Sequence, residues 1–265
     1  MAASSQTVAD GLRHLFGRLH AAIPAQGSPE TMFTTWQRVV GADSTDNLAI
    51  VERIGLFSAA VQKLEAQINA SRDLDATMKS AALATVSSLK VFFRVDMFHT
   101  QVFQYKGYCS PEVCGRIGMI GLSLRDEFSE PRLLKSIADE ISSLLTEVSS
   151  KLEDRGMPLD LRLNLRRHIR AMQWWLANFE LASVQDLIET MGSAIVISKQ
   201  IEQRSASDDT QTEASRSVST KIANAATILG RLVGLVPKIV EGADKLTTDG
   251  QHLIDAFHST GVPHP

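Results

Sequence analysis

The feature that most constrains this chain is the recurrence of apolar residues every three or four positions over long segments. Its 16 glycines and 8 prolines gather at a few places, so these segments run without interruption. A spacing of three to four residues matches the turn of an α-helix and puts the apolar side chains on one face. The pattern predicts an all-α protein, an extended multi-helix bundle with a separable C-terminal amphipathic helix.

The composition is that of an ordinary soluble chain. Of the 265 residues, 44% are hydrophobic and 22% are charged, which is typical of a globular protein with a buried core. No run of about 18 uncharged apolar residues occurs, so no segment predicts an ordinary membrane-spanning helix. The N-terminal segment lacks the apolar core and cleavage site of a secretory signal. We therefore expect a cytoplasmic protein, with a peripheral position at the inner face of the membrane as an alternative.

The net charge of −3 gives no global positive field of the kind that attracts nucleic acid, so nucleic acid is not an expected partner.

The first part of the chain, 1–106, is predicted to form an N-terminal helical subdomain. Its helices are expected over about 5–23, 29–41, 46–68 and 75–105. Ser28 followed by Pro29 is typical of an N-cap with proline at the first helical position, and Asp73 or Asp75 is expected to cap the fourth helix.

A break is predicted over 107–128, where glycines, a proline and both cysteines lie close together. We interpret this stretch as a hinge or a boundary between subdomains. A second helical subdomain is expected over 129–204, with Ser129 capping its first helix. The β-branched run 193–198 lies inside a helical window and is interpreted as helix.

Residues 205–216 are polar and predict a linker, which makes 217–265 a separate amphipathic element. The sixteen residues between Lys221 and Lys238 span about 24 Å of helix, short of a hydrocarbon core of about 30 Å. A charge midway would cost about 2.5–3.5 kcal/mol, so a lone spanning helix is excluded. We expect the helix instead to lie at an anionic membrane surface, or to pack on the bundle or on a copy of itself. An oligomer whose polar stripes line a wet pore is a further alternative. The candidate contact residues are Lys221, Leu229, Arg231, Leu232, Val236, Lys238 and Val240.

The leucine pattern of residues 157–192, which ends at Gly192, resembles a two-helix module of uncharacterised bacterial proteins. In that module a membrane-interacting segment often follows. The resemblance implies a bacterial stress or antiphage setting, and it brings no catalytic residue with it.

Three glycines with GxxGxxG spacing, Gly115, Gly118 and Gly121, lie in the predicted hinge. The stretch lacks the Lys-Ser/Thr ending of a phosphate loop and the preceding strand of a dinucleotide site. Close helix packing is the expected role. The alternative is a backbone surface near an anionic ligand, with Arg116 beside it.

No constellation of catalytic residues stands out. Cys109 and Cys114 are five residues apart, too far for a CxxC pair, and we expect two reduced thiols. Asp96 and His99 are one helical turn apart, but a metal site would need a third ligand. The chain also lacks a nucleophile elbow and a Walker A motif. We therefore expect a non-enzymatic protein with no cofactor and no metal.

A basic stripe is the more informative pattern, with arginines at i, i+4 and i+8. The candidate anion-binding or ligand-binding residues are Arg162, Arg166, Arg167, Arg170 and Trp174. Like charges at this spacing repel unless something negative meets them. The candidates are the acidic helix over 130–154, a partner protein, a phosphate-bearing ligand or an anionic lipid.

The sequence favours a non-enzymatic regulatory or effector protein that acts by self-association or membrane contact through its C-terminal helix. Its expected partners are itself, as a homo-oligomer, another helical protein, or an anionic membrane surface. One alternative is a soluble helical adaptor or scaffold without a membrane role. The other is a sensor of a phosphorylated ligand through Arg162, Arg166 and Arg170.

Overall fold

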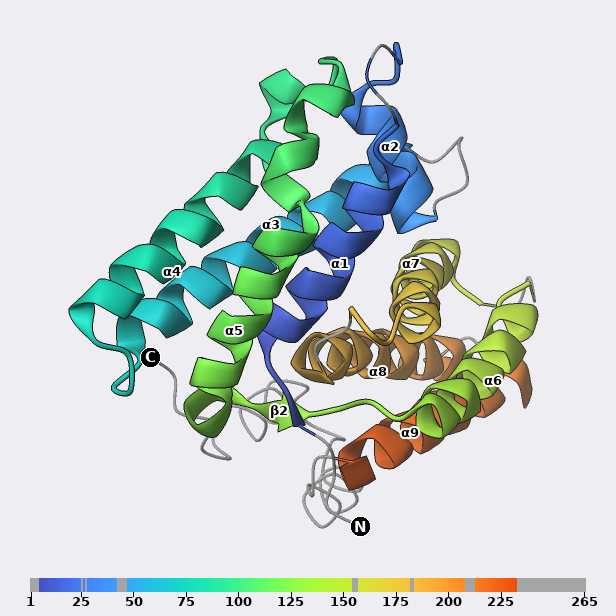
Figure 1. Ribbon diagram of the computed structural model, residues 1–265. Coiled ribbons are helices and arrows are strands. Elements are labelled where there is room, and N and C mark those ends of the chain that lie inside the picture. Colours follow the sequence, from blue (N-terminus) through green and yellow to red (C-terminus); the bar gives the residue numbers. More distant parts are fainter. Residues whose placement is uncertain are drawn as a thin grey trace. The chain divides into compact units, whose positions relative to one another are not determined.

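The predicted all-α class is confirmed by a computed structural model of the chain (Figure 1). The structure describes residues 5–24, 26, 28–41, 47–153, 157–181, 184–207 and 213–232. The chain divides into two compact units, with the division after Glu130. Within the described ranges, no helix has both the length and the apolar character needed to cross a membrane.

Unit 1 is built from five α-helices and three short 3-10 helices in its described part. They are α1 (Val8–Ala22), α2 (Met32–Val40), α3 (Asn47–Ala70), α4 (Ala76–Leu89), η1 (Lys90–Phe93), η2 (Val95–Met97), η3 (Val102–Cys109) and α5 (Pro111–Phe128). Helix α1 contacts α2, α3 and α5, and α4 contacts both α3 and α5. A two-residue strand, β1 (Ser5–Gln6), pairs with β2 (Glu130–Pro131). Helix α1 therefore lies at the centre of the unit.

An aromatic cluster forms the core of unit 1 around Trp36 of α2. Its indole is fully buried and stacks on Phe57 of α3, with ring centroids 6.1 Å apart. The indole Nε1–H donates to the backbone carbonyl of Phe92, at 2.9 Å. Phe92 in turn lies 5.5 Å from the ring of Phe16 on α1. One side chain thus joins α2 to α3 and η1 and satisfies its own polar group in doing so.

The helix expected over 75–105 is shorter in the structure. Of the two expected caps, Asp73 and Asp75, it is Asp75 that caps α4, accepting from the backbone N–H of Met78 at 2.8 Å, but the α-helix ends at Leu89. Beyond it the chain turns through 3-10 helices so that the Thr100 carbonyl accepts from the N–H of Met32, at 3.0 Å. This backbone pairing with a distant segment replaces the helical hydrogen bonds of residues 98–102.

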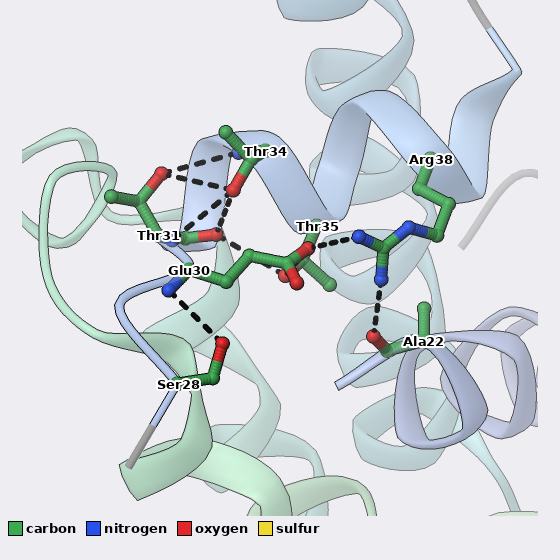
Figure 2. Close-up of polar contacts among 7 residues, drawn as sticks. All are labelled: Ala22, Ser28, Glu30, Thr31, Thr34, Thr35 and Arg38. Carbon is green, nitrogen blue, oxygen red and sulfur yellow. Dashed lines mark hydrogen bonds and ion pairs between the residues drawn. The ribbon is translucent and has the colours of Figure 1, made fainter. Parts of the chain in front are cut away.

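The start of α2 also differs from the prediction of a Ser28 cap with Pro29 at the first helical position. The N-cap is Thr31, whose hydroxyl accepts from the N–H of Thr34 at 3.3 Å. Ser28 instead accepts from the N–H of Glu30 at 3.3 Å (Figure 2). The helix starts later because the chain before it pairs with residues 98–102.

Glu30 anchors this helix start from the side (Figure 2). Its carboxylate forms an ion pair with Arg38 of α2 at 2.6 Å and accepts from the Thr35 hydroxyl at 3.3 Å. The guanidinium of Arg38 also donates to the carbonyl of Ala22, the last residue of α1, at 2.8 Å. One arginine therefore connects the turn before α2 with the carboxyl end of α1.

Other cationic side chains of unit 1 also bind the carboxyl ends of helices. Each donates to a backbone carbonyl at the carboxyl end of a helix. The carbonyls there have no intrahelical N–H donor, and the helix dipole is negative at this end. The other donor and acceptor pairs are Lys106 with Ile23, Arg18 with Val39, Arg53 with Val40, and Lys79 with Asn69. Much of the basic charge of this unit is thus committed to its own fold.

The stretch predicted as a hinge over 107–128 is instead mostly the continuous helix α5, which packs on α1. Ser110 caps it and Pro111 occupies its first turn. The glycines explain the difference, because they admit α1 rather than interrupt α5. A Cβ on Gly121 would lie 2.8 Å from the Thr7 hydroxyl oxygen. The predicted close packing is confirmed there.

The other two glycines of the motif differ from each other. A Cβ on Gly118 would lie 3.1 Å from the side chain of Arg13, whereas a Cβ on Gly115 would meet nothing within 4 Å. Only part of the motif therefore serves the contact with α1, and Gly115 provides a matched control for Gly121.

The variant Gly121→Ala is expected to be less stable than Gly115→Ala by about 1–3 kcal/mol, the usual cost of overpacking. Both changes bring the same gain of about 1 kcal/mol in helix propensity, so their difference isolates the contact with α1. Urea denaturation followed by circular dichroism measures it. Equal midpoints for the two variants would contradict the close approach of α1 and α5.

Unit 2 is a bundle of four helices in the part that the structure describes. They are α6 (Lys135–Lys151), α7 (Leu159–Ala177), α8 (Val184–Ser207) and α9 (Glu213–Leu232). Each helix contacts the next one along the chain, and α9 also contacts α6, which closes the bundle. The predicted helical structure of 193–198 is confirmed within α8. The buried residues include Ile141, Leu145, Val148, Leu165, Ile169, Met172, Ala194, Ile201, Val218, Ile222, Ala225 and Leu229.

The C-terminal element differs from the predicted linker over 205–216 and separable helix. Helix α8 continues to Ser207, and α9 begins at Glu213 and contacts both α6 and α8. The apolar stripe of α9 explains this, because its burial in the bundle removes Ile222 and Leu229 from water. The described part of the C-terminal element therefore belongs to unit 2.

Candidate functional site on α7

Helix α7 presents opposite faces to the bundle and to solvent. Leu165, Ile169 and Met172 are fully buried. On the other side, Arg167 and Arg170 are both exposed, and we call them the exposed arginine pair. They are three residues apart, so their side chains are neighbours on the helix surface.

Arg166 is occupied within the bundle. Its guanidinium forms an ion pair with Glu153 at 2.6 Å and also donates to the carbonyl of Leu152, beyond the end of α6. Its side chain is 28% exposed. Of the partners expected for the basic stripe, the acidic segment 130–154 is therefore the one that binds Arg166. Arg162 is half-buried.

Trp174, the aromatic candidate of the stripe, is buried. Its ring lies edge-on to that of Trp175, with centroids 4.9 Å apart and an angle of 62°. A buried indole in this position packs the bundle and offers no flat surface for stacking of a ligand. The five predicted candidates therefore separate into an exposed pair and three residues that are buried or partly buried.

Two carboxylates of unit 2 form ion pairs with cations of α8 and α9. Asp160 pairs with Arg204 at 3.0 Å, and Glu147 of α6 pairs with Lys221 of α9. Hydrogen bonding from the backbone of Leu161 and then the Arg204 guanidinium lower the pKa of Asp160. Among the residues described, no carboxylate lies within ion-pair distance of Arg170.

His168, beside the pair on α7, adds no charge at neutral pH. Burial lowers its pKa below the usual value of 6.5, and the adjacent Arg167 cation lowers it further. The positive charge of this face therefore comes from its arginines.

Two exposed leucines lie on the same side of α7. The exposed fraction is 58% for Leu159 and 52% for Leu163, and we call these residues the exposed leucine pair. At 100° per residue they fall on the arc that carries Arg167 and Arg170. The predicted stripe does not include them, although the sequence contains a signal. Leucines that alternate with polar residues over 159–165 cannot all lie on one face of a helix.

The predicted C-terminal candidates lie elsewhere. Lys221 is held by Glu147, and Leu229 is buried in the bundle. Arg231 and Leu232 end α9, and their side chains are not part of the description. The remaining three candidates, Val236, Lys238 and Val240, lie outside the described residues.

The two thiols of unit 1 and the Asp96–His99 pair were the other candidates for chemistry. Burial raises the pKa of Cys109 to about 12 and also raises that of Cys114, so both thiols are protonated at neutral pH. Asp96 pairs with Arg94 at 2.5 Å. Within the described ranges, no group of three His, Cys, Asp or Glu residues is placed to hold a metal ion.

Comparisons with known proteins found no matching family model, no matching curated protein and no matching solved structure. The resemblance of residues 157–192 to a bacterial two-helix module therefore stays a prediction. In the structure this stretch covers α7 and the first part of α8.

Proposed function

We propose that the protein is a non-enzymatic helical adaptor that binds an anionic, phosphate-bearing partner through the exposed arginine pair. The exposure of Arg167 and Arg170 on one face of α7 carries this proposal. A guanidinium presents a planar fork of donors that matches the oxygens of a phosphate. The chain is otherwise slightly acidic, with a net charge of −3, so this attraction is local.

The contact surface that we propose lies on α7 and not on α9. The sequence favours the C-terminal helix, but the apolar residues Ile222 and Leu229 lie within the bundle. Arg167 and Arg170, in contrast, are exposed on α7. A cytoplasmic location with access to the inner face of the membrane suits this role, and the resemblance of 157–192 implies a bacterial stress or antiphage setting.

Retention on phosphocellulose in a salt gradient tests the proposal. The variant Arg167→Gln/Arg170→Gln is expected to elute at markedly lower salt, because each arginine near an anionic surface contributes about 1 kcal/mol. Together the two losses correspond to an affinity about 30-fold weaker.

The matched control is Arg94→Gln/Arg116→Gln, which removes the same charge from exposed arginines of unit 1. Those arginines are paired with Asp96 and Glu112. The control should elute close to the unmodified protein. Elution of both double variants at the same salt concentration would mean that net charge, rather than the α7 face, determines retention.

A further inference from the structure

We infer that the partner of α7 is the surface of an anionic lipid bilayer. This inference rests on the proposed function and names its ligand, and the exposed leucine pair is the observation that carries it. Leu159 and Leu163 leave more than half of each side chain in water. They lie one helical turn apart, just before the exposed arginine pair.

A bilayer surface satisfies both kinds of side chain at once. The phosphate groups of the lipids meet guanidinium groups, and leucine side chains enter the boundary between headgroups and acyl chains. A small phosphate ligand in water would use Arg167 and Arg170 and would leave Leu159 and Leu163 exposed. The exposed arginine pair and the exposed leucine pair on one face therefore match a bilayer, whose headgroup layer is anionic and whose interior is apolar.

The geometry suits a helix that lies in the plane of the membrane. From Leu159 to Arg170 the helix rises about 16 Å, and the four side chains of the two pairs face one side. The opposite side of α7 is held by the buried Leu165, Ile169 and Met172. The face is thus formed before contact, so docking requires no folding of the segment.

Co-sedimentation of the full chain with vesicles tests this inference. The unmodified protein should bind vesicles that contain phosphatidylglycerol and should not bind vesicles of phosphatidylcholine alone. The variant Leu159→Ser/Leu163→Ser should bind the anionic vesicles at least about tenfold more weakly, because it removes the apolar area that enters the bilayer. Both positions are exposed, so the helix content by circular dichroism should not change.

The control is Met119→Ser/Leu122→Ser on α5, whose side chains are 66% and 57% exposed. It makes an equivalent apolar-to-polar change outside α7 and should bind the anionic vesicles as the unmodified protein does. Equal loss of vesicle binding in the two variants would overturn the inference, because apolar exposure in general would then explain the binding.

The experiment separates this inference from the proposed function. The leucine variant should keep the elution position of the unmodified protein on phosphocellulose. If it also keeps full vesicle binding while Arg167→Gln/Arg170→Gln loses it, the inference is wrong and the phosphate-binding role stands. Retention on phosphocellulose without any vesicle binding would likewise overturn the inference, in favour of a soluble phosphate or an acidic protein. If Arg167→Gln/Arg170→Gln keeps both the retention on phosphocellulose and the vesicle binding, the proposed function itself is refuted.

Discussion

Replacement of Ile222 by aspartate is expected to destabilise the protein by about 3–5 kcal/mol, the cost of a buried charge without a partner. Ile222 is fully buried on the face of α9 that packs in the bundle. An aspartate there must stay protonated, remain ionised in an apolar environment, or detach α9 from α6 and α8. Urea denaturation followed by circular dichroism measures the loss.

The control for this variant is Asn224→Asp, which adds the same carboxylate to the exposed side of the same helix. Its effect should stay within about 0.5 kcal/mol. Similar stabilities for the two variants would show that α9 does not contribute its apolar face to the bundle. The prediction therefore tests whether this helix is a structural member of unit 2 or a separate element.

Replacement of Trp36 by alanine should destabilise unit 1 by about 3–5 kcal/mol. The change removes the ring that stacks on Phe57 and leaves the Phe92 carbonyl without its donor. Hydrogen exchange should accelerate in α2, α3 and η1, while α6 to α9 should keep their protection.

The variant Trp36→Phe separates the two contributions. It keeps most of the aromatic packing but loses the indole donor, which is worth about 1–3 kcal/mol when the buried acceptor stays unsatisfied. Its stability should lie between that of the unmodified protein and that of Trp36→Ala. An alanine variant that loses less than about 1 kcal/mol would contradict the central place of Trp36 in this core.

Local patterns were sufficient to predict the helical class and several details. The run 193–198 contains β-branched residues, yet its position within a periodic apolar window correctly indicated helix. The Asp75 cap was also predictable, because a cap depends on residues within a single turn. These features are determined by neighbours in sequence.

Features set by distant contacts could not be predicted in this way. The glycines of 107–128 predicted both close helix packing and a break in the chain, and only the approach of α1 to Gly118 and Gly121 shows that they pack without a break. The start of α2 depends on backbone pairing with residues 98–102, so Thr31 rather than Ser28 caps it. In both cases the deciding partner lies far away in the chain.

The candidate site shows the same division. The spacing of the arginines on one helix was visible in the sequence, but the pairing of Arg166 with Glu153 depends on how α6 and α7 meet. The exposed leucine pair was predictable in principle from the alternation over 159–165. Which of those leucines face solvent is decided by the bundle, since Leu161 and Leu165 are buried.

The most direct test of contact between α7 and a membrane is the collision accessibility of a nitroxide attached at Leu163→Cys. The chain would carry Cys109→Ala and Cys114→Ala, and a second label at Asn224→Cys on α9 would serve as reference. With phosphatidylglycerol vesicles, the label at position 163 should gain collisions with oxygen and lose those with a water-soluble nickel complex, while the label at 224 should not change. Entry of the label at 224 into the bilayer, with the label at 163 still in water, would contradict the placement of the binding surface on α7.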